Sequence, residues 1–556
     1  MRFNLPKLFL YLLGAVLILN LLQANFTNLI FDEAYYWYYA KTMDWGYFDH
    51  PPMVAWMIQI GSFFFDGELG VRFVSILLSI GTPLLLWAAI DHPKKNDYTL
   101  HFLVLVFSMP LLHAYGFFTL PDTPLLFFTA LFLLFYKKFL KDPNALFAVG
   151  LGLAMAGLMY SKYNAAIIIL FVLFSNLKLV FNKTAWLAVG IALLCYVPHF
   201  IWLYDNDFIS IQYHLTERPN QAYDFLKFTG GFFVNLIALF GFTFPIVYWS
   251  LYKTVSKDKF TKALLYLTYG IILFFFVSSF QRRVQTQWLI AICIPMVLLT
   301  FDYLAANKAT AKWLLRIGSL NIAILFFARI GLIYEPLFPV TYETHGNKKW
   351  IKEIENAATG SPIVFENSYR DAPMYEFYSG KPAISFNNIR YRQNQYSIDG
   401  AEASVQGKEV YYLSKYRKKA GRSFPMGDGR HTLYGSFIPN FESFRKLKCL
   451  IRSEEITFNT EKTQTMQVYN PYKEDIPIEK LRFGIAYMND YKEVRDVLKM
   501  KANPSDSEVL LLKSNDTVNF TFKLPQTDMK RPAYFKIGIS ENGLPLGLNG
   551  KNIKLK

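Results

Sequence analysis

Long apolar segments alternate with short polar connections from the N-terminus to about Tyr334. Crossing a bilayer takes about 17–25 predominantly apolar helical residues, and eleven segments approach that length, the fifth being short. The first is too long for a signal peptide and lacks a small-x-small cleavage site. We therefore predict eleven spans, at residues 8–28, 71–90, 100–119, 123–140, 145–160, 164–181, 185–203, 231–251, 264–280, 286–304 and 313–333.

The pattern changes after Tyr334, where the chain becomes polar with short alternating runs. Strands are expected at 363–366, 410–413 and 519–523, and a helix at 372–379 ended by Gly380. The predicted fold is a polytopic α-helical membrane protein with a C-terminal α+β extracytoplasmic domain. Its domains are a transmembrane part at 1–336, with a long first outer loop at 30–70, and an extracytoplasmic part at 340–556.

The composition agrees with a membrane protein. Of 556 residues, 53% are hydrophobic and 18% are charged, whereas soluble domains average about 25% charged residues. This excludes a disordered chain and a purely soluble enzyme. The only three cysteines are Cys195, Cys293 and Cys449, which excludes a disulfide scaffold and a Cys-rich zinc module.

The net charge of +16 has a topological explanation. With the N-terminus inside, the inner segments carry fifteen basic residues, Arg2 among them, and the outer connections before Tyr334 carry six. Cytoplasmic loops are the basic ones in membrane proteins, so this orientation is favoured. It predicts a multi-pass protein of the cell inner (plasma) membrane with residues after Tyr334 outside. No nucleic-acid partner is required.

The first outer loop concentrates polar and aromatic residues in FDEAYYWYYAKTMDWGYFDHPPMVAW, residues 31–56. Asp32 and Glu33 directly follow the first span, and Asp49 and His50 precede two prolines. Charges near a bilayer are costly, so such clusters are commonly functional. The alternative is an interfacial aromatic belt with helix-capping acids.

Four further outer connections carry candidate residues. Asp122 lies in LPDTP, where it could instead cap the next helix, and Lys162 lies in SKY, where it could instead snorkel. Arg282 and Arg283 could clamp a phosphate or pair with carboxylates. The spacing of Asp205 and Asp207 is a weak metal-binding signal.

These residue types suit chemistry with a phosphate leaving group. A carboxylate can deprotonate a hydroxyl, and fixed cations can stabilise a departing phosphate. The sequence has no Walker loop, Rossmann glycine fingerprint, H-E-x-x-H or G-x-S-x-G. A lipid-borne substrate is therefore favoured over a cytosolic nucleotide donor.

The first outer loop resembles that of the family 39 glycosyltransferases, which include bacterial aminoarabinose lipid A transferases and protein O-mannosyltransferases. LPDTP, SKY, RRVQTQW at 282–288, ENSYRDAPMYEFYSGKP at 366–382 and RYRQNQY at 390–396 follow in the same order, so the resemblance extends to about residue 400. Two positions depart from the lipid A enzymes. Tyr35 stands where they carry an arginine, and His50 where they carry a lysine.

The resemblance implies a GT-C fold and an inverting transfer from a polyprenyl-phosphate-linked sugar to a lipid, protein or glycan acceptor at the outer face of the bilayer. Asp32 and Glu33 correspond to the catalytic acidic pair, with Asp32 as general base. Arg282, Arg283, Lys162 and His50 are candidates for the donor phosphate; Asp49, Asp122 and Tyr35 are candidates for positioning the acceptor or the loop. No cofactor is required, although a divalent metal is possible.

Two other classes of function remain open. A transporter or flippase of lipid-linked sugars would also need many spans, although no internal repeat is visible. A membrane-anchored binding module would not need eleven spans. Release of free polyprenyl phosphate distinguishes the enzyme from both.

Overall fold

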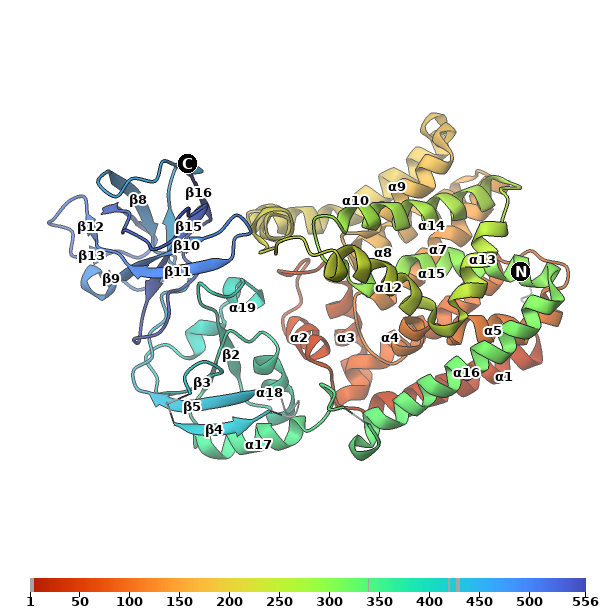
Figure 1. Ribbon diagram of the computed structural model, residues 1–556, viewed down its shortest axis with the longest axis horizontal. Coiled ribbons are helices and arrows are strands. Elements are labelled where there is room, and N and C mark those ends of the chain that lie inside the picture. Colours follow the sequence, from red (N-terminus) through yellow and green to blue (C-terminus); the bar gives the residue numbers. More distant parts are fainter. Residues whose placement is uncertain (1–4, 339, 419–420, 427–430) are drawn as a thin grey trace. The chain divides into compact units, whose positions relative to one another are not determined.

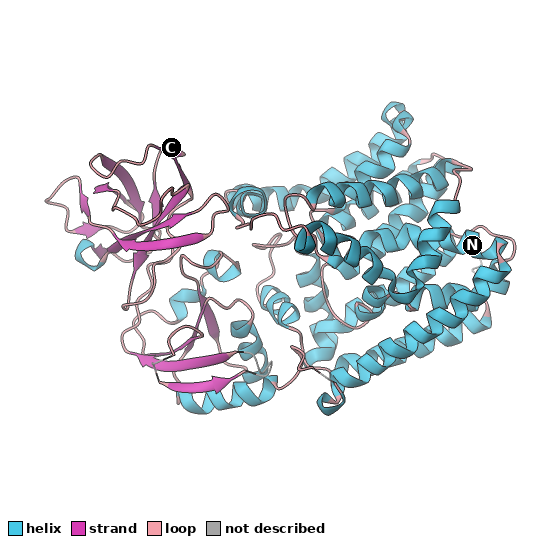
Figure 2. Cartoon of the chain, viewed as in Figure 1, coloured by secondary structure: helices cyan, strands magenta, loops and turns pink. Residues whose placement is uncertain are grey.

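The computed structural model describes residues 5–338, 340–418, 421–426 and 431–556; Arg2 lies outside them. The chain divides into two compact units. The first comprises residues 1–207 and 223–345, and the second comprises residues 208–222 and 346–556. Figure 2 shows that the first unit is helical and that the strands belong to the second.

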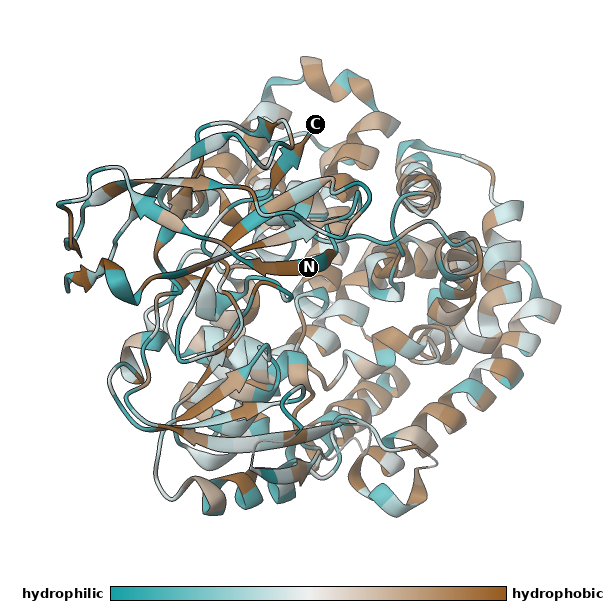
Figure 3. Cartoon of the chain, turned by 60° about the vertical axis from the view of Figure 1, so that its left-hand side comes forward, coloured by the Kyte–Doolittle hydropathy of each residue, from teal (hydrophilic) through white to brown (hydrophobic). Residues whose placement is uncertain are grey.

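Seven helical segments of the first unit are long and apolar enough to cross a membrane. They are α1 (Lys7–Phe26), α4 (Gly67–Ala89), α7 (Asp122–Lys141), α10 (Lys183–Asp205), Leu226–Lys253 containing α12 (Gly231–Phe240) and α13 (Phe244–Lys253), α14 (Lys259–Ser278) and α16 (Lys308–Ile333). Brown, hydrophobic residues follow these helices in Figure 3.

The remaining helices of this unit are shorter. They are α2 (Phe31–Ala40), α3 (Met53–Phe64), α5 (Thr99–Phe107), α6 (Pro110–Ala114), α8 (Ala145–Ser161), α9 (Ala165–Ser175) and α15 (Cys293–Ala306). All eleven predicted spans are largely helical. Among the residues that the structure describes, however, only seven helical segments have the length and composition required for crossing, so the count of eleven is not confirmed. The segment 100–119, for example, is interrupted before Pro110, whose ring is compatible only with the first turn of a new helix.

Small residues allow close helix packing around α8. A Cβ on Gly152 would lie 2.6 Å from the carbonyl oxygen of Ala188 on α10, and one on Gly157 would lie 2.3 Å from the Phe128 ring on α7. α8 therefore approaches both neighbours closely, and the turn after it is held near the start of α7.

The second unit begins with an α/β layer. Its sheet has the order β2-β1-β3-β5-β4, with β1 parallel to β2 and β3, and β5 antiparallel to β3 and β4. The predicted strands at 363–366 and 410–413 and the helix ended by Gly380 are confirmed. The elements are α17 (Asn347–Ala358), β1 (Ile363–Glu366), α18 (Asp371–Ser379), β2 (Ala383–Phe386), α19 (Gln395–Ile398), β3 (Val410–Ser414), β4 (Arg422–Pro425) and β5 (Thr432–Ile438).

The rest of the unit is built mainly from two sheets, ordered β11-β10-β15-β16-β7 and β12-β14-β8-β6, whose strand pairs are antiparallel except for the parallel pair β16–β7. Alternate residues of β8, β10, β14 and β15 share one core, as expected for facing sheets. The expected strand at 519–523 forms part of β14. The strands are β6 (Lys448–Leu450), β7 (Glu455–Ile456), β8 (Thr463–Tyr469), β9 (Ile476–Pro477), β10 (Arg482–Met488), β11 (Val494–Lys499), β12 (Ala502–Pro504), β13 (Leu511–Leu512), β14 (Thr517–Lys523), β15 (Tyr534–Ser540) and β16 (Ile553–Leu555).

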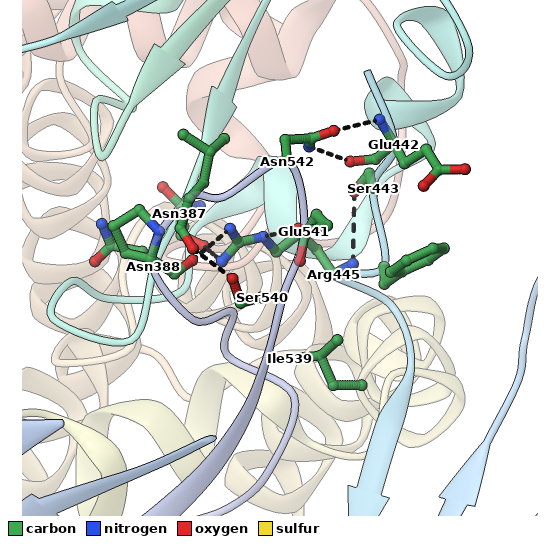
Figure 4. A network of polar contacts seen from close by, with 12 residues as sticks. Asn387, Asn388, Glu442, Ser443, Arg445, Ile539, Ser540, Glu541 and Asn542 are labelled. Carbon is green, nitrogen blue, oxygen red and sulfur yellow. Dashed lines mark hydrogen bonds and ion pairs between the residues drawn. The ribbon is translucent and has the colours of Figure 1, made fainter. Parts of the chain in front are cut away.

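A polar network joins the α/β layer to the two-sheet part (Figure 4). Arg445 donates to the carbonyl oxygen of Asn387 over 2.8 Å, and its Nε lies 2.6 Å from a carboxylate oxygen of Glu541. Asn542 and Glu442 exchange hydrogen bonds of 2.6 and 3.0 Å beside this pair. Burial raises the pKa of the Glu541 carboxyl to about 7, against the opposing effect of Arg445.

Candidate active site

The acidic pair lies in the first turn of α2, which follows α1 after a short extended segment (Figure 1). The Glu33 carboxylate accepts a hydrogen bond of 3.1 Å from the Ile30 amide, and Glu343 accepts one of 3.1 Å from the Phe31 amide. Both bonds satisfy amides that would have no partner within the helix. The positive end of the helix also favours carboxylates at this position.

Glu33 forms a fully buried ion pair with Arg72 of α4. The guanidinium donates to both carboxylate oxygens, over 2.8 Å from Nε and 2.5 Å from Nη2, and both side chains are 0% exposed. The Thr119 amide donates to Glu33 over 2.8 Å. The other Arg72 bonds reach carbonyl oxygens at the end of α1, at Ala24, Thr27 and Asn28. Glu33 therefore ties together α2, α4, the end of α1 and the segment before α7.

Asp32 is partly accessible, unlike Glu33. Its carboxylate and that of Asp122 both interact electrostatically with the buried Tyr115 side chain. The structure thus brings two carboxylates, from the first turns of α2 and α7, to one phenol. A partly accessible carboxylate beside a rigid ion pair can accept a proton from a positioned hydroxyl.

Asp122 forms an ion pair with Lys162. The distance from Lys162 Nζ to Asp122 Oδ1 is 2.8 Å, and the side chains are 12% and 5% exposed, respectively. Asp122 is the first residue of α7 and its side chain makes no capping hydrogen bond, so the helix-cap interpretation is wrong. The snorkelling interpretation of Lys162 is also wrong, because its ammonium pairs with a buried carboxylate.

Aromatic residues hold Asp49 and His50 against α2. Tyr35 and Tyr39 donate hydroxyl hydrogen bonds to Asp49 over 3.1 and 3.3 Å. The His50 ring meets the Tyr36 ring edge to face at 5.6 Å. These tyrosines are buried, so they pack within the protein and do not form an interfacial belt.

The same loop also attaches to α10. Trp202 donates to the Asp44 carboxylate over 2.8 Å, and His199 Nδ1 lies 2.6 Å from the Trp45 carbonyl oxygen. The backbone at Gly46 packs so closely against the Trp202 ring that a Cβ there would lie 2.3 Å from it, and only glycine fits. The loop is therefore held by α2 on one side and by α10 on the other.

The remaining predicted residues lie in other segments. Arg282 and Arg283 are in the turn after α14, where Arg282 is partly buried and Arg283 is exposed. Asp205 ends α10, and Asp207 follows with a φ of 53°; both are exposed. Within the described ranges, no group of three or more His, Cys, Asp or Glu side chains could hold a metal ion.

An apolar cavity of about 330 Å³ borders this region. Its lining comes mainly from α1, α4, α5 and α16 and includes Tyr115 and Thr123 beside the carboxylates. One part of the lining is polar and contains Asn20, His113 and Arg329. The cavity thus combines a long apolar surface with a cation.

Arg329 of α16 is 3% exposed and makes its hydrogen bonds to neutral groups. It donates to Asn20 over 3.0 Å and to Gln23 over 3.2 Å, and its guanidinium lies 4.4 Å from the centroid of the Phe117 ring. Among the described residues no carboxylate forms an ion pair with it. A buried charge without a counter-ion is costly, and an anion in the cavity would reduce that cost.

Sequence reasoning missed Arg72, Arg329 and Glu343. A signal for the two arginines was available, because each falls within a predicted span, where ionisable residues are rare and mostly functional. Nothing in the sequence singles out Glu343, because it lies in an ordinary polar segment. Its contact with α2 exists only in the folded chain, since the two are 312 positions apart.

The sequence and the fold are similar to those of known proteins. Residues 49–202 match the family model described as dolichyl-phosphate-mannose-protein mannosyltransferase. The lipid A galacturonosyltransferase RgtD of Rhizobium johnstonii is 22% identical over 294 residues, which are 48% of this chain. The match spans only 59% of that relative.

The crystal structure of ArnT from Cupriavidus metallidurans in the apo state superposes with a TM-score of 0.57 at 13% identity. The structure of the same protein bound to undecaprenyl phosphate superposes with a TM-score of 0.54 at 14% identity. Each match covers 77% of this chain and 97% of ArnT. The chain has the ArnT fold, which confirms the predicted fold class of a polytopic helical domain followed by a strand-containing domain.

Proposed function

We propose that this protein is a membrane glycosyltransferase that moves a sugar from a polyprenyl-phosphate donor to an acceptor at the outer face of the membrane. The observation that carries the proposal is the partly accessible Asp32, held at the start of α2 by the buried Glu33–Arg72 pair. The family match, the relative and the ArnT fold all support the same class of reaction.

The cavity beside Tyr115 suits a lipid-linked donor. Its apolar walls can take part of a polyprenyl chain, and Arg329 supplies a cation for the phosphate. The bound undecaprenyl phosphate in the ArnT structure supports a ligand of this kind. Lys162, His50, Arg282 and Arg283 remain further candidates for contacts with the phosphate.

In the proposed reaction Asp32 removes the proton from an acceptor hydroxyl. The hydroxyl oxygen then bonds to the anomeric carbon while the bond from that carbon to the phosphate oxygen breaks. The electron pair of the broken bond stays on the polyprenyl phosphate, and the anomeric configuration inverts. Glu33 fixes the position of Asp32, and Asp49, Asp122 and Tyr35 hold the surrounding loop and turn. No cofactor is needed for these steps.

The test is release of polyprenyl phosphate by the purified chain in detergent with a panel of polyprenyl-phosphate sugars and candidate acceptors. General-base catalysis contributes about 10²–10⁴-fold, so Asp32→Asn should reduce release by about that factor while donor binding persists. Asp66→Asn, the same change at an exposed position before α4, is the control.

Near-normal release by Asp32→Asn would refute the assignment of the base and make Asp122 the next candidate. Absence of release from every donor, together with movement of lipid-linked sugar across vesicles, would favour the transporter or flippase. The sugar and the acceptor can be identified by mass spectrometry of glycolipids and glycoproteins from a deletion strain.

A further inference from the structure

The second unit contains a basic pocket of about 270 Å³, separate from the transmembrane cavity. Four segments of the second unit line this pocket, together with Lys536 of β15. The segments are residues 213–219, 389–393, 488–494 and 548–552. The segment 213–219 comes from between α10 and α12 but belongs to this unit. The pocket therefore joins parts of the chain that are far apart in sequence.

Cations outnumber carboxylates in the lining of this pocket. The cationic side chains are Arg390, Arg392, Lys492 and Lys536, and the acidic ones are Glu217 and Glu493. The Glu493 carboxylate already lies 2.5 Å from the guanidinium of Arg495. Glu217 forms an ion pair with Lys536, one of the four cations.

The cations are held in position by surrounding side chains. Arg392 donates to the Tyr213 hydroxyl over 3.3 Å, and its guanidinium lies 4.4 Å from the centroid of the Tyr369 ring. Lys492 donates to the Thr216 carbonyl oxygen and lies over the Tyr534 ring. Such contacts reduce the entropy lost when a ligand binds.

Two partly buried polar side chains, Lys536 and Asn552, also line the pocket. The Lys536 side chain is 14% exposed and lies 3.5 Å from Glu217, and burial lowers its pKa against the effect of that carboxylate. Asn552 donates to Glu217 over 2.9 Å, while its buried Oδ1 has no hydrogen-bond partner among the described residues. A ligand with a donor group would satisfy this oxygen, which is otherwise costly to bury.

We propose that this pocket binds an anionic saccharide through its phosphate or carboxylate. The basic side chains would bind the anionic group, since guanidinium and ammonium groups form strong charge-assisted hydrogen bonds. The Asn552 oxygen and the Gln393 amide would bind sugar hydroxyls. The volume equals that of roughly nine waters at about 30 Å³ each, which exceeds the space that a phosphate group alone requires.

Ligand-observed NMR on the purified full chain in detergent tests this site directly, with glucose 1-phosphate as probe. Glucose 1-phosphate should bind more tightly than either glucose or inorganic phosphate. The double variant Arg390→Gln/Lys492→Gln should weaken binding at least tenfold, because each charged hydrogen bond contributes about one order of magnitude or more. The control Lys462→Gln/Lys523→Gln makes the same charge change at exposed positions and should leave binding unchanged.

The variant Glu217→Gln gives an effect of opposite sign. Removing the carboxylate that pairs with Lys536 should tighten binding of glucose 1-phosphate several-fold. If the ion pair had only a structural role, the affinity would not increase. If the double variant does not fold, Arg390→Gln alone, at an exposed side chain, still tests the loss of affinity.

Equal affinities for inorganic phosphate and glucose 1-phosphate would overturn the saccharide assignment. Undetectable binding, or binding insensitive to both Arg390→Gln and Glu217→Gln, would overturn the site itself. The measurement does not depend on turnover, so a failure of the proposed transferase activity and a failure of this site give different results.

Discussion

At the scale of single residues, the two acids of the first outer loop have different environments although they are adjacent. Glu33 is fully buried and bonded to Arg72, Ile30 and Thr119, whereas Asp32 is partly accessible. The sequence predicted the acidic pair, with Asp32 as the base, but could not show that Glu33 is buried and ion-paired. Their difference depends on Arg72, which lies 39 positions away from Glu33 along the chain.

The Glu33–Arg72 pair should contribute to the stability of the fold. Breaking a buried ion pair by removing one partner costs about 3–5 kcal/mol, because the other charge is left without compensation. Glu33→Gln and Arg72→Met should therefore each lower the thermal unfolding temperature of the detergent-solubilised protein. Removing both charges in Glu33→Gln/Arg72→Met should cost less than the sum of the single changes. Full additivity would show that the pair contributes no coupling energy.

Arg329 should control the affinity for polyprenyl phosphate. Its charge has neutral hydrogen-bond partners and borders the apolar cavity, so Arg329→Gln should weaken binding by about tenfold or more, as expected for one charged hydrogen bond. Arg316→Gln is the matched control, because Arg316 lies on the same helix and is exposed. If Arg282→Gln/Arg283→Gln weakens binding and Arg329→Gln does not, the phosphate lies at the turn after α14 and not in the cavity.

At the scale of elements, hydrophobic patterning located nearly all of the membrane-domain helices because a long apolar run has few alternatives to a buried or membrane helix. It could not show where runs are interrupted. The segment 231–251 breaks at Gly241, whose φ is 54°. The Asn321 side chain of α16 donates to the Phe240 carbonyl oxygen there, and a Cβ on Gly241 would lie 2.4 Å from it. That interruption depends on a residue 80 positions away. The two-sheet part of the second unit was also not predicted beyond the strand at 519–523, since short strands find their partners only in the folded chain.

The network around Glu541 should make the stability of the second unit depend on pH. The pKa of the Glu541 carboxyl is about 7 in the folded state, above its value in the unfolded chain. At a pH between the two pKa values, folding is therefore accompanied by uptake of a proton. The stability contributed by the protonated Glu541 carboxyl is therefore present at low pH and is lost as the pH rises toward 7. The unfolding temperature should fall between pH 5 and 8 in the wild type.

In Glu541→Gln, which keeps the shape but cannot ionise, this decline should be smaller. Ser540, the neighbouring residue, offers a control in Ser540→Ala, which leaves the carboxyl in place and should retain the wild-type pH profile. An unchanged profile in Glu541→Gln would assign the pH dependence to another group.

At the scale of the whole molecule, the two units come from interleaved parts of the chain. Residues 208–222 separate α10 from α12 in sequence, yet they belong to the second unit. Composition did not reveal this, because the segment lies within the apolar half of the chain and its contacts are with residues more than 150 positions later, such as Arg392 and Asn552.

The sequence also predicts the orientation of the chain in the membrane. The fifteen basic residues predicted inside, against six outside, predict that residues after Tyr334 lie on the outer face, together with Asp32 and its loop. In intact cells, a membrane-impermeant maleimide should therefore modify Lys462→Cys, an exposed position in the second unit. It should modify Lys257→Cys, an exposed position between α13 and α14, only after permeabilisation. The wild-type chain is the background control, because Cys293 and Cys449 are buried and Cys195 lies within α10. The reverse labelling pattern would place Asp32 on the cytoplasmic side and would exclude a donor used at the outer face.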